Sequence, residues 1–269
     1  MASGKGINTA KALVRLGHEV TLLQILAGEN GKRCQEDCVK WGIRTLNVWV
    51  EGETRCCTTL LDSDGMATEL IAPFRIWETD LEPRLLEVLK NNSTYDALLF
   101  CGSQPEGLPE NLFRSLLDAV AANLVVWDSA VPWPADRVTR IRWIKVNEAE
   151  RVALKNAITW LDPKSTGWDS GEIFPSLFIT AGSNPAFVSK PSSAQGYYPV
   201  PWITGIRNPI GAGDAVTAGL TDSILRGSLP EEAVAWALAI GTASCLSPLP
   251  TEWDLEKAET FKTEIRRRP

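Results

Sequence analysis

Apolar segments of strand length alternate with segments of helical pattern through the middle of this 269-residue chain. Short apolar runs of this kind predict buried strands, here over residues 96–101, 124–127, 142–146 and 177–181. Helical patterns lie before or between them, over 81–91, over 109–122 and directly after Asn147. Such alternation is typical of a mostly parallel sheet with helices on both faces, so the predicted fold class is α/β.

The ends of the chain extend this pattern. A helix over 7–16, a strand over 20–26 and a helix to Trp41 are predicted first, and helices over 215–226, 230–245 and 255–267 come last. Short strands are expected over 46–50, 54–61 and 66–71, with a hairpin turn at 62–65 and a surface loop at 160–171. We expect one domain over residues 1–269, with a small β lid contributed by about 45–76.

Charge and composition exclude several classes of protein. The formal net charge of −6 argues against nucleic acid or an anionic membrane as the main partner. No apolar run reaches membrane-spanning length and the N-terminus is too polar for a signal peptide, so we expect a cytoplasmic protein. The six cysteines lack Cys-x-x-Cys spacing and are expected to be free thiols. The single histidine, His18, is expected to be solvated in a turn, which leaves carboxylates as acid–base candidates.

The segment Asn-Pro-Ile-Gly-Ala-Gly-Asp at 208–214 precedes a predicted helix of small residues. Gly211 and Gly213 let the backbone turn sharply and approach a ligand, because neither carries a Cβ atom. The first amides of a helix have no internal partner, so they can hold an anion such as phosphate. Asp214, the one acid there, is a candidate base, although an aspartate at a helix start is more often a cap.

Polar residues follow several of the predicted strands. In sheets of this kind ligands bind beyond the carboxyl ends of the strands, so these residues are expected to converge on one site. They lie at 102–103, 128–129, 147–150, 180–182 and 211–214. Convergence at one edge strengthens the catalytic interpretation of Asp214.

Two basic residues near the start of the chain could hold a further anion. Lys5 lies between Gly4 and Gly6 at the start of a predicted helix, where a cation and unpaired amides can meet a phosphate. The alternative for Lys5 is a frayed, solvated chain end. Arg55 is either a solvated strand residue or a phosphate clamp.

Six motifs follow one another along nearly the whole chain. They are Gly-Lys-Gly-Ile-Asn at 4–8, Thr-Arg at 54–55, Gly-Met-Ala-Thr-Glu at 65–69, Gly-Ser-Gln-Pro-Glu-Gly-Leu-Pro at 102–109, Lys-Val-Asn-Glu-Ala-Glu at 145–150 and the segment 208–214. Each motif alone is weakly specific, but six in this order resemble the ribokinase-like (PfkB) carbohydrate kinases, and most closely the branch that contains 1-phosphofructokinase and tagatose-6-phosphate kinase.

The resemblance implies ATP-dependent phosphorylation of a ketohexose phosphate, of the fructose 1-phosphate or tagatose 6-phosphate type. Asp214 would be the general base, and the amides of Gly211, Ala212 and Gly213 would stabilise charge on the transferring phosphoryl group. The phosphate already on the sugar would be held by Lys5 and Arg55, with Gly4, Asn8 and Ser103 nearby.

The same resemblance implies ATP and Mg²⁺ as cofactors. Lys145, Thr180 and Gly182 would line the ATP site, and Ser244 stands where the family often has an asparagine near the adenine. Asn147 and Glu150 would organise Mg²⁺ through water. A homodimer formed through the lid is a further expectation.

The chain also departs from the family pattern. Family members begin earlier, with a core strand and an aspartate that holds sugar hydroxyls, whereas this sequence starts directly before Gly-Lys-Gly, with Ser3 in place of a glycine. Val146 replaces a proline, and the loop at 247–250 is shortened. We expect a mis-assigned start or a damaged copy, and an apolar sheet edge left unpaired.

Two other functions stay open. A non-catalytic protein that binds a nucleotide or a sugar phosphate is favoured by the missing aspartate. A kinase for a free sugar or a nucleoside is less favoured, because Lys5 and Arg55 point to a second phosphate.

Overall fold

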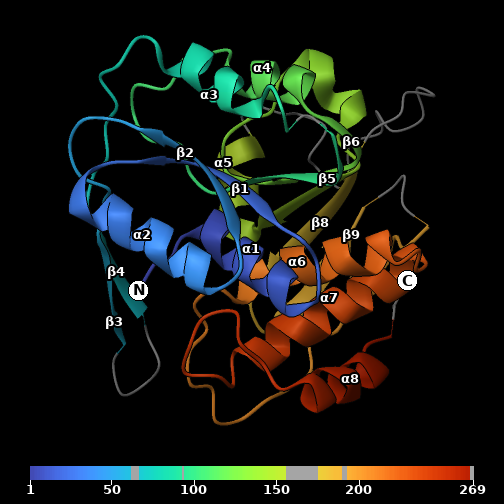
Figure 1. Cartoon of the computed structure of the whole chain (residues 1–269). Coiled ribbons are helices and arrows are strands. Elements are labelled where there is room, and N and C mark those ends of the chain that lie inside the picture. Colours follow the sequence, from blue (N-terminus) through green and yellow to red (C-terminus); the bar gives the residue numbers. More distant parts are fainter. Residues whose placement is uncertain (62–66, 93, 156–174, 190–192, 267–269) are drawn as a thin grey trace.

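The computed structural model describes residues 1–61, 67–92, 94–155, 175–189 and 193–266 (Figure 1). The expected turn at 62–65 and the expected loop at 160–171 lie outside these residues. The helices are α1 (Lys5–Arg15), α2 (Gly28–Lys40), α3 (Leu81–Leu89), α4 (Leu112–Ala119), η1 (Ala135–Arg140, a 3-10 helix), α5 (Glu148–Lys155), α6 (Ala212–Leu225), α7 (Pro230–Ser244) and α8 (Leu255–Glu264). The strands are β1 (Thr21–Leu26), β2 (Arg44–Trp49), β3 (Cys57–Leu61), β4 (Ala67–Ile71), β5 (Thr94–Cys101), β6 (Ala121–Asp128), β7 (Trp143–Asn147), β8 (Ser176–Ala181), β9 (Asn184–Val188) and β10 (Gly196–Tyr198).

The central sheet confirms the predicted fold class. Its order is β10-β9-β8-β7-β6-β5, with β5 to β8 parallel and with β9 and β10 antiparallel at one edge. Strand β9 was not predicted from the sequence. Strand β10 ends at Tyr198, because the following Pro199 and Pro201 have no amide proton for a ladder.

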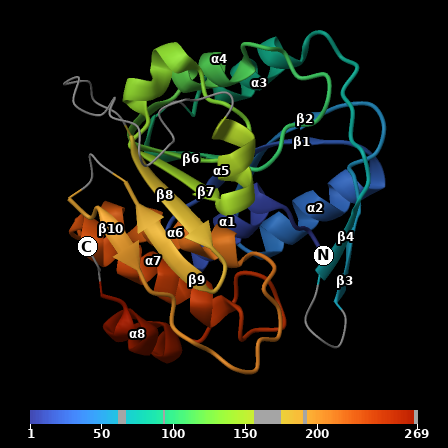
Figure 2. The same cartoon turned by 180° about the vertical axis from the view of Figure 1, so that it is seen from behind.

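Helices cover both faces of this sheet (Figures 1 and 2). Leu124 and Val126 of β6 pack in the cluster that contains α6 and α7, whereas Val125 and Trp127 pack in the cluster on the opposite face, with Leu117 of α4. Successive side chains of a strand point to opposite faces, so a strand buried on both sides needs apolar residues throughout. This explains the continuous apolar run in β6.

The N-terminal strands form a separate sheet. β1 and β2 pair in parallel with each other, and in the described residues β1 has no second partner, while β5 is an unpaired edge of the central sheet. These open edges agree with the expectation of an unpaired sheet edge. β2 falls in the range 45–76 expected for the lid, but only β3 and β4 form the small antiparallel sheet that extends from the body (Figure 1).

Close packing between α6 and α7 fixes the position of α6. A Cβ atom on Gly219 would lie 3.0 Å from Ala237 Cα, and one on Gly241 would lie 2.5 Å from Val216 Cγ2. Because small residues stand at both crossing points, the two helix backbones can approach closely. Residues 214–223 of α6 are buried as a result, whereas Ala212 and Gly213 at its start are half-buried.

His18 is not the solvated turn residue that the sequence suggested. Its Nε2 atom lies 2.8 Å from Oδ1 of Asp222, whose side chain is 3% exposed. Trp236 Nε1 and Arg226 Nε also donate to the Asp222 carboxylate, at 2.9 and 2.6 Å. The cluster joins the end of α1 to α6 and α7. The environment of His18 therefore depends on Asp222, which is 204 positions away in the sequence.

Replacement of His18 by alanine should destabilise the fold by about 1–2 kcal/mol, because the buried Asp222 carboxylate loses a donor. Urea unfolding measures this loss. Lys32→Ala is a suitable control, since it removes an ion pair between exposed side chains of Lys32 and Glu29, which should contribute little. A loss for the His18 variant no larger than that of the control would contradict the assignment.

The cysteines and the helix lengths bear on two expectations from the sequence. All six cysteines are free thiols, as their spacing predicted. Among the described residues, no helix has both the length and the apolar character needed to cross a lipid bilayer.

Candidate active site

The N-terminus of α6 begins at a sharp turn of the backbone. Gly211 is its N-cap residue, with φ of 79°, and a Cβ atom there would lie 3.1 Å from Pro250 Cβ and 3.3 Å from Thr251 Cγ2. A side chain at this position is therefore disfavoured by both backbone conformation and space. The helix starts at Ala212, three residues before the predicted start, so Asp214 lies in its first turn.

Asp214 does not cap this helix. No side-chain cap hydrogen bond is present at the start of α6. Instead, Oδ2 of Asp214 accepts a hydrogen bond of 2.8 Å from Nδ2 of Asn8 on α1. Asp214 is only 6% exposed, and among the described residues its other carboxylate oxygen accepts no hydrogen bond. The contact joins two residues that were assigned to one site from separate motifs.

The surroundings of Asp214 make it a better base than an ordinary aspartate. Burial raises its pKa to about 6, with a further contribution from the negative charge of Asp128, while the Asn8 hydrogen bond and the charges of Lys145 and Lys5 act in the opposite direction. A carboxylate of that pKa is ionised at neutral pH and holds a proton more strongly than a solvated one. This suits a group that accepts a proton during a reaction.

The amides of this turn are only partly free. Ala212 N donates to Pro209 O at 3.2 Å, so this amide already has a partner. In the part of the chain that the structure describes, the amides of Gly211 and Gly213 have no acceptor. A Cβ atom on Gly213 would lie 3.0 Å from Nζ of Lys145, which brings a cation close to these amides. Two amides, a cation and the helix dipole make this turn attractive to an anion.

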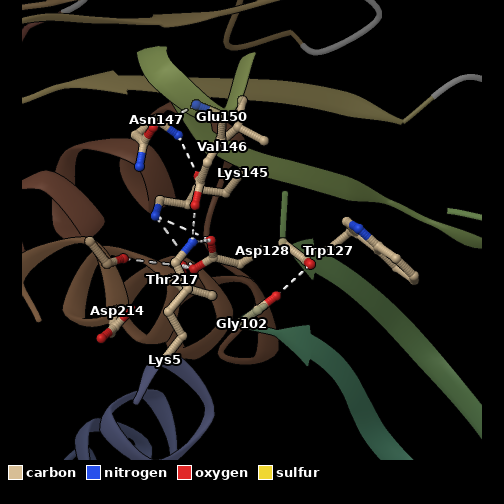
Figure 3. Close-up of polar contacts among 12 residues, drawn as sticks. Lys5, Gly102, Trp127, Asp128, Lys145, Val146, Asn147, Glu150, Asp214 and Thr217 are labelled. Carbon is tan, nitrogen blue, oxygen red and sulfur yellow. Dashed lines mark hydrogen bonds and ion pairs between the residues drawn. The ribbon is translucent and has the colours of Figure 1, made fainter. Parts of the chain in front are cut away.

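A buried charge cluster lies beside the turn and is centred on Asp128, whose side chain is 0% exposed (Figure 3). Lys5 Nζ lies 2.8 Å from its Oδ1, Lys145 Nζ lies 3.4 Å from both oxygens, and Thr217 Oγ1 donates to Oδ2 at 2.6 Å. Burial opposes ionisation, but the two lysines and the threonine hold the pKa of Asp128 below its ordinary value.

The sequence predicted a specific site role for Lys145 but none for Asp128. Lys145 was expected to line the ATP site, yet it is 2% exposed and paired with Asp128 beneath the first turn of α6. Asp128 was noted only as a strand end and Thr217 was not considered. The available signal for Asp128 was a charged residue directly after the apolar run of β6.

Asn147 and Glu150 form a reciprocal cap at the start of α5. Glu150 N donates to Asn147 Oδ1 at 2.8 Å, and Asn147 N donates to Glu150 Oε2 at 2.9 Å. The remaining Glu150 oxygen, Oε1, lies 2.5 Å from Nζ of Lys5. Burial lowers the pKa of Lys5, but the charges and hydrogen bonds of Asp128 and Glu150 raise it above its ordinary value overall.

The remaining residues predicted to bind the sugar phosphate lie around the same place. Arg55, just before β3, donates from Nη2 to Ser103 Oγ at 2.9 Å. Gly102 precedes Ser103, and a Cβ atom on Gly102 would lie 3.7 Å from Cβ of Lys5. Gly4 is the N-cap of α1, with φ of 121°. Arg55, Ser103 and Lys5 are therefore neighbours, although they come from three separate motifs.

Three residues predicted to bind ATP make no contact with the charge cluster in the described residues. Thr180 Oγ1 donates to Val146 O at 3.4 Å, and Gly182 is exposed in the turn after β8 with φ of 61°. Ser244 is 1% exposed and its hydroxyl donates to Gly241 O at 2.9 Å, so this hydroxyl faces its own helix. A contact between Ser244 and a base would require another rotamer.

The chain matches known proteins over nearly its whole length. Residues 1–258 match the profile of the pfkB family carbohydrate kinases. A 1-phosphofructokinase of Borreliella burgdorferi is 28% identical over 256 residues, covering 91% of this chain and 81% of the relative. A tagatose-6-phosphate kinase of Staphylococcus epidermidis is 26% identical over 260 residues, with the same two coverages.

Solved structures agree on the fold. Phosphofructokinase-2 from Escherichia coli, in complex with potassium, superposes with a TM-score of 0.79 at 19% identity, covering 97% of this chain and 87% of that one. A ribokinase from Thermotoga maritima gives a TM-score of 0.73, also at 19% identity and with the same coverages. These similarities establish a ribokinase-like arrangement of the elements described above.

Proposed function

The chain belongs to the pfkB family of carbohydrate kinases, and we propose on this basis that it transfers the terminal phosphoryl group of ATP to a hydroxyl of a phosphorylated ketohexose. The single observation that carries the proposal is the position of Asp214. It combines a buried carboxylate, a raised pKa and two unpaired amides within one helical turn. Fructose 1-phosphate and tagatose 6-phosphate are the proposed substrate types, in line with the names of two relatives.

In this proposal Asp214 accepts the proton of the attacking hydroxyl. Asn8 donates to Oδ2 and so holds the carboxylate in one orientation, which leaves Oδ1 to receive the proton. A positioned base of this kind accelerates such reactions by about 10²–10⁴-fold. The amides of Gly211 and Gly213 stabilise the charge that develops on the transferring group, and the helix dipole adds to their effect.

The sugar phosphate would be held by Arg55 and Lys5. Arg55 comes from the segment before β3 and already reaches Ser103 across the site. A guanidinium can bind two phosphate oxygens at once, whereas an ammonium acts as a point charge. Arg55 therefore orients the sugar phosphate, and Lys5 supplies a second positive charge.

The donor set near α5 is compatible with Mg²⁺. Asn147 and Glu150 offer amide and carboxylate oxygens, which are the ligands that Mg²⁺ prefers, and the cation usually keeps several waters. Because these two side chains also cap α5, they would hold the cation through water. When bound, it would neutralise phosphate charge during transfer.

Measurement of ADP release tests the proposal. The purified chain is expected to turn over with fructose 1-phosphate, tagatose 6-phosphate or another ketohexose phosphate, and much less with free ketohexoses and nucleosides. Folding is checked by circular dichroism, and ATP binding by calorimetry. A folded protein that binds ATP without turnover on any acceptor would identify the non-catalytic alternative instead.

The pH dependence of kcat/KM provides a second test. Asp214 must be ionised to accept a proton, so activity should rise as pH increases and should be half-maximal near pH 6, the pKa to which burial raises this carboxyl group. An ordinary solvated aspartate would put this limb near pH 4. A profile that is flat from pH 5 to 8, with saturating metal, would argue against Asp214 as the base.

A further inference from the structure

Lys5 lies between two carboxylates from different elements. Its Nζ atom is 2.8 Å from Asp128 Oδ1 at the end of β6 and 2.5 Å from Glu150 Oε1 in α5 (Figure 3). The Asp128 side chain is 0% exposed and that of Glu150 is 13% exposed, so both ion pairs are largely removed from water. Such pairs are much stronger than exposed ones.

Each carboxylate binds another protein donor through one oxygen and Lys5 through the other. On Asp128, Oδ2 accepts the hydroxyl of Thr217, and on Glu150, Oε2 accepts the amide of Asn147. The other two oxygens, Oδ1 and Oε1, both bind the Lys5 ammonium, and Lys145 lies farther away, 3.4 Å from each Asp128 oxygen. The ammonium therefore occupies a position that is built for a cation from two preoriented oxygen donors.

This arrangement conflicts with a simple role for Lys5 in binding phosphate. Lys5 and Lys145 balance the charges of Asp128 and Glu150, and an ionised Asp214 then leaves the cluster with a surplus negative charge. An incoming phosphate would meet no net attraction from these five groups. A further cation at the two carboxylates would remove the conflict, because Lys5 would then be available to the phosphate.

We propose that Lys5 is a displaceable counter-ion. While the site lacks a divalent cation, the Lys5 ammonium neutralises Asp128 and Glu150. When such a cation binds Oδ1 of Asp128 and Oε1 of Glu150, Lys5 leaves these carboxylates and pairs with the sugar phosphate. The inference rests on the proposed function, since it concerns the same phosphate. The exchange of Lys5 couples two binding events. The divalent cation strengthens binding of the sugar phosphate, and the sugar phosphate strengthens binding of the cation by the same factor, even without nucleotide.

The test measures Mn²⁺ binding to the protein alone, by electron paramagnetic resonance or calorimetry. Lys5→Met removes the competing ammonium and should tighten Mn²⁺ binding by about 5- to 150-fold, the range of ordinary coupling energies. Lys11→Met is the matched control, because Lys11 is on the same helix and pairs with Glu252. It should bind Mn²⁺ as the unmodified protein does. Lys5→Gln, which keeps a donor without the charge, should act like Lys5→Met if that variant folds poorly.

A second measurement adds fructose 1-phosphate or inorganic phosphate to the titration. Either should tighten Mn²⁺ binding to the unmodified protein and should have little effect on the Lys5→Met protein. Equal or weaker Mn²⁺ binding by both Lys5 variants would overturn the inference, as would absence of Mn²⁺ binding by all the proteins. Because none of these measurements needs turnover, their failure is distinguishable from failure of the proposed kinase activity.

Discussion

Replacement of Asp214 by asparagine should lower kcat by about 100-fold or more while ATP still binds. Asparagine has nearly the same shape and can still accept the hydrogen bond from Asn8, so the site should keep its geometry. Only the capacity to take a proton is lost. Steady-state kinetics together with calorimetry of ATP binding separate these two effects.

The control for this variant is Asp254→Asn. Asp254 is a true helix cap, because its side chain accepts the amide of Lys257 at the start of α8. Asparagine caps helices about as well as aspartate, so neither activity nor stability should change much. If Asp214→Asn retained the rate of this control, Asp214 would not be the base.

The same Asp214 variant should be more stable than the unmodified protein at neutral pH. The folded-state pKa of about 6 exceeds the ordinary value of 3.8, so the native state is stabilised by the protonated form and loses that stability as pH rises from about 4 to 6. Removal of the charge should recover on the order of 2–3 kcal/mol above pH 6 and nothing near pH 4. Urea unfolding at the two pH values measures the difference.

Replacement of Asp128 by asparagine should cause the largest loss of stability, about 3–5 kcal/mol. The substitution preserves shape but leaves Lys145, which is 2% exposed, as a buried cation without its carboxylate. An uncompensated charge in the interior is far more costly than a missing surface pair. Urea unfolding provides the measurement, with an unchanged m value as the sign that two-state behaviour is retained.

Two further variants establish the cause of that loss. Asp118→Asn affects a carboxylate that is 44% exposed and paired with Arg137, and it should cost less than about 1 kcal/mol. The double variant Asp128→Asn with Lys145→Met removes both buried charges and should regain part of the lost stability. If the double variant were as unstable as the sum of the single ones, charge pairing would not explain the effect.

The lid and the site show where prediction from sequence was incomplete. The strand expected over 46–50 fell within the range of about 45–76 given for the lid, and in the structure β2 pairs in parallel with β1. Short strands carry similar local signals wherever they pair, so only the assembled sheet identifies the partner. The sequence around Ser244 likewise does not indicate that its hydroxyl donates to Gly241 O.

Residues that were missed or misjudged have distant partners. Asp128 contacts Lys5, which is 123 positions away in the sequence, and His18 contacts Asp222, which is 204 positions away. The register of β5 against β6 places Asp128 beside Cys101, directly before Gly102 and Ser103. A strand end can be recognised in a sequence, but the order of strands in the sheet determines which ends are adjacent.

The α/β class, the sharp glycine turn before α6 and the polar residues at the strand ends could all be predicted from the amino-acid sequence. These features depend on local backbone preferences and on the spacing of apolar residues, which short windows of sequence contain. The folded arrangement was needed to see that Asp214 is desolvated beside Asn8, and that Lys5 pairs with Asp128 and Glu150. Burial and charge pairing are sums over groups that folding brings together from distant positions, so no single segment encodes them.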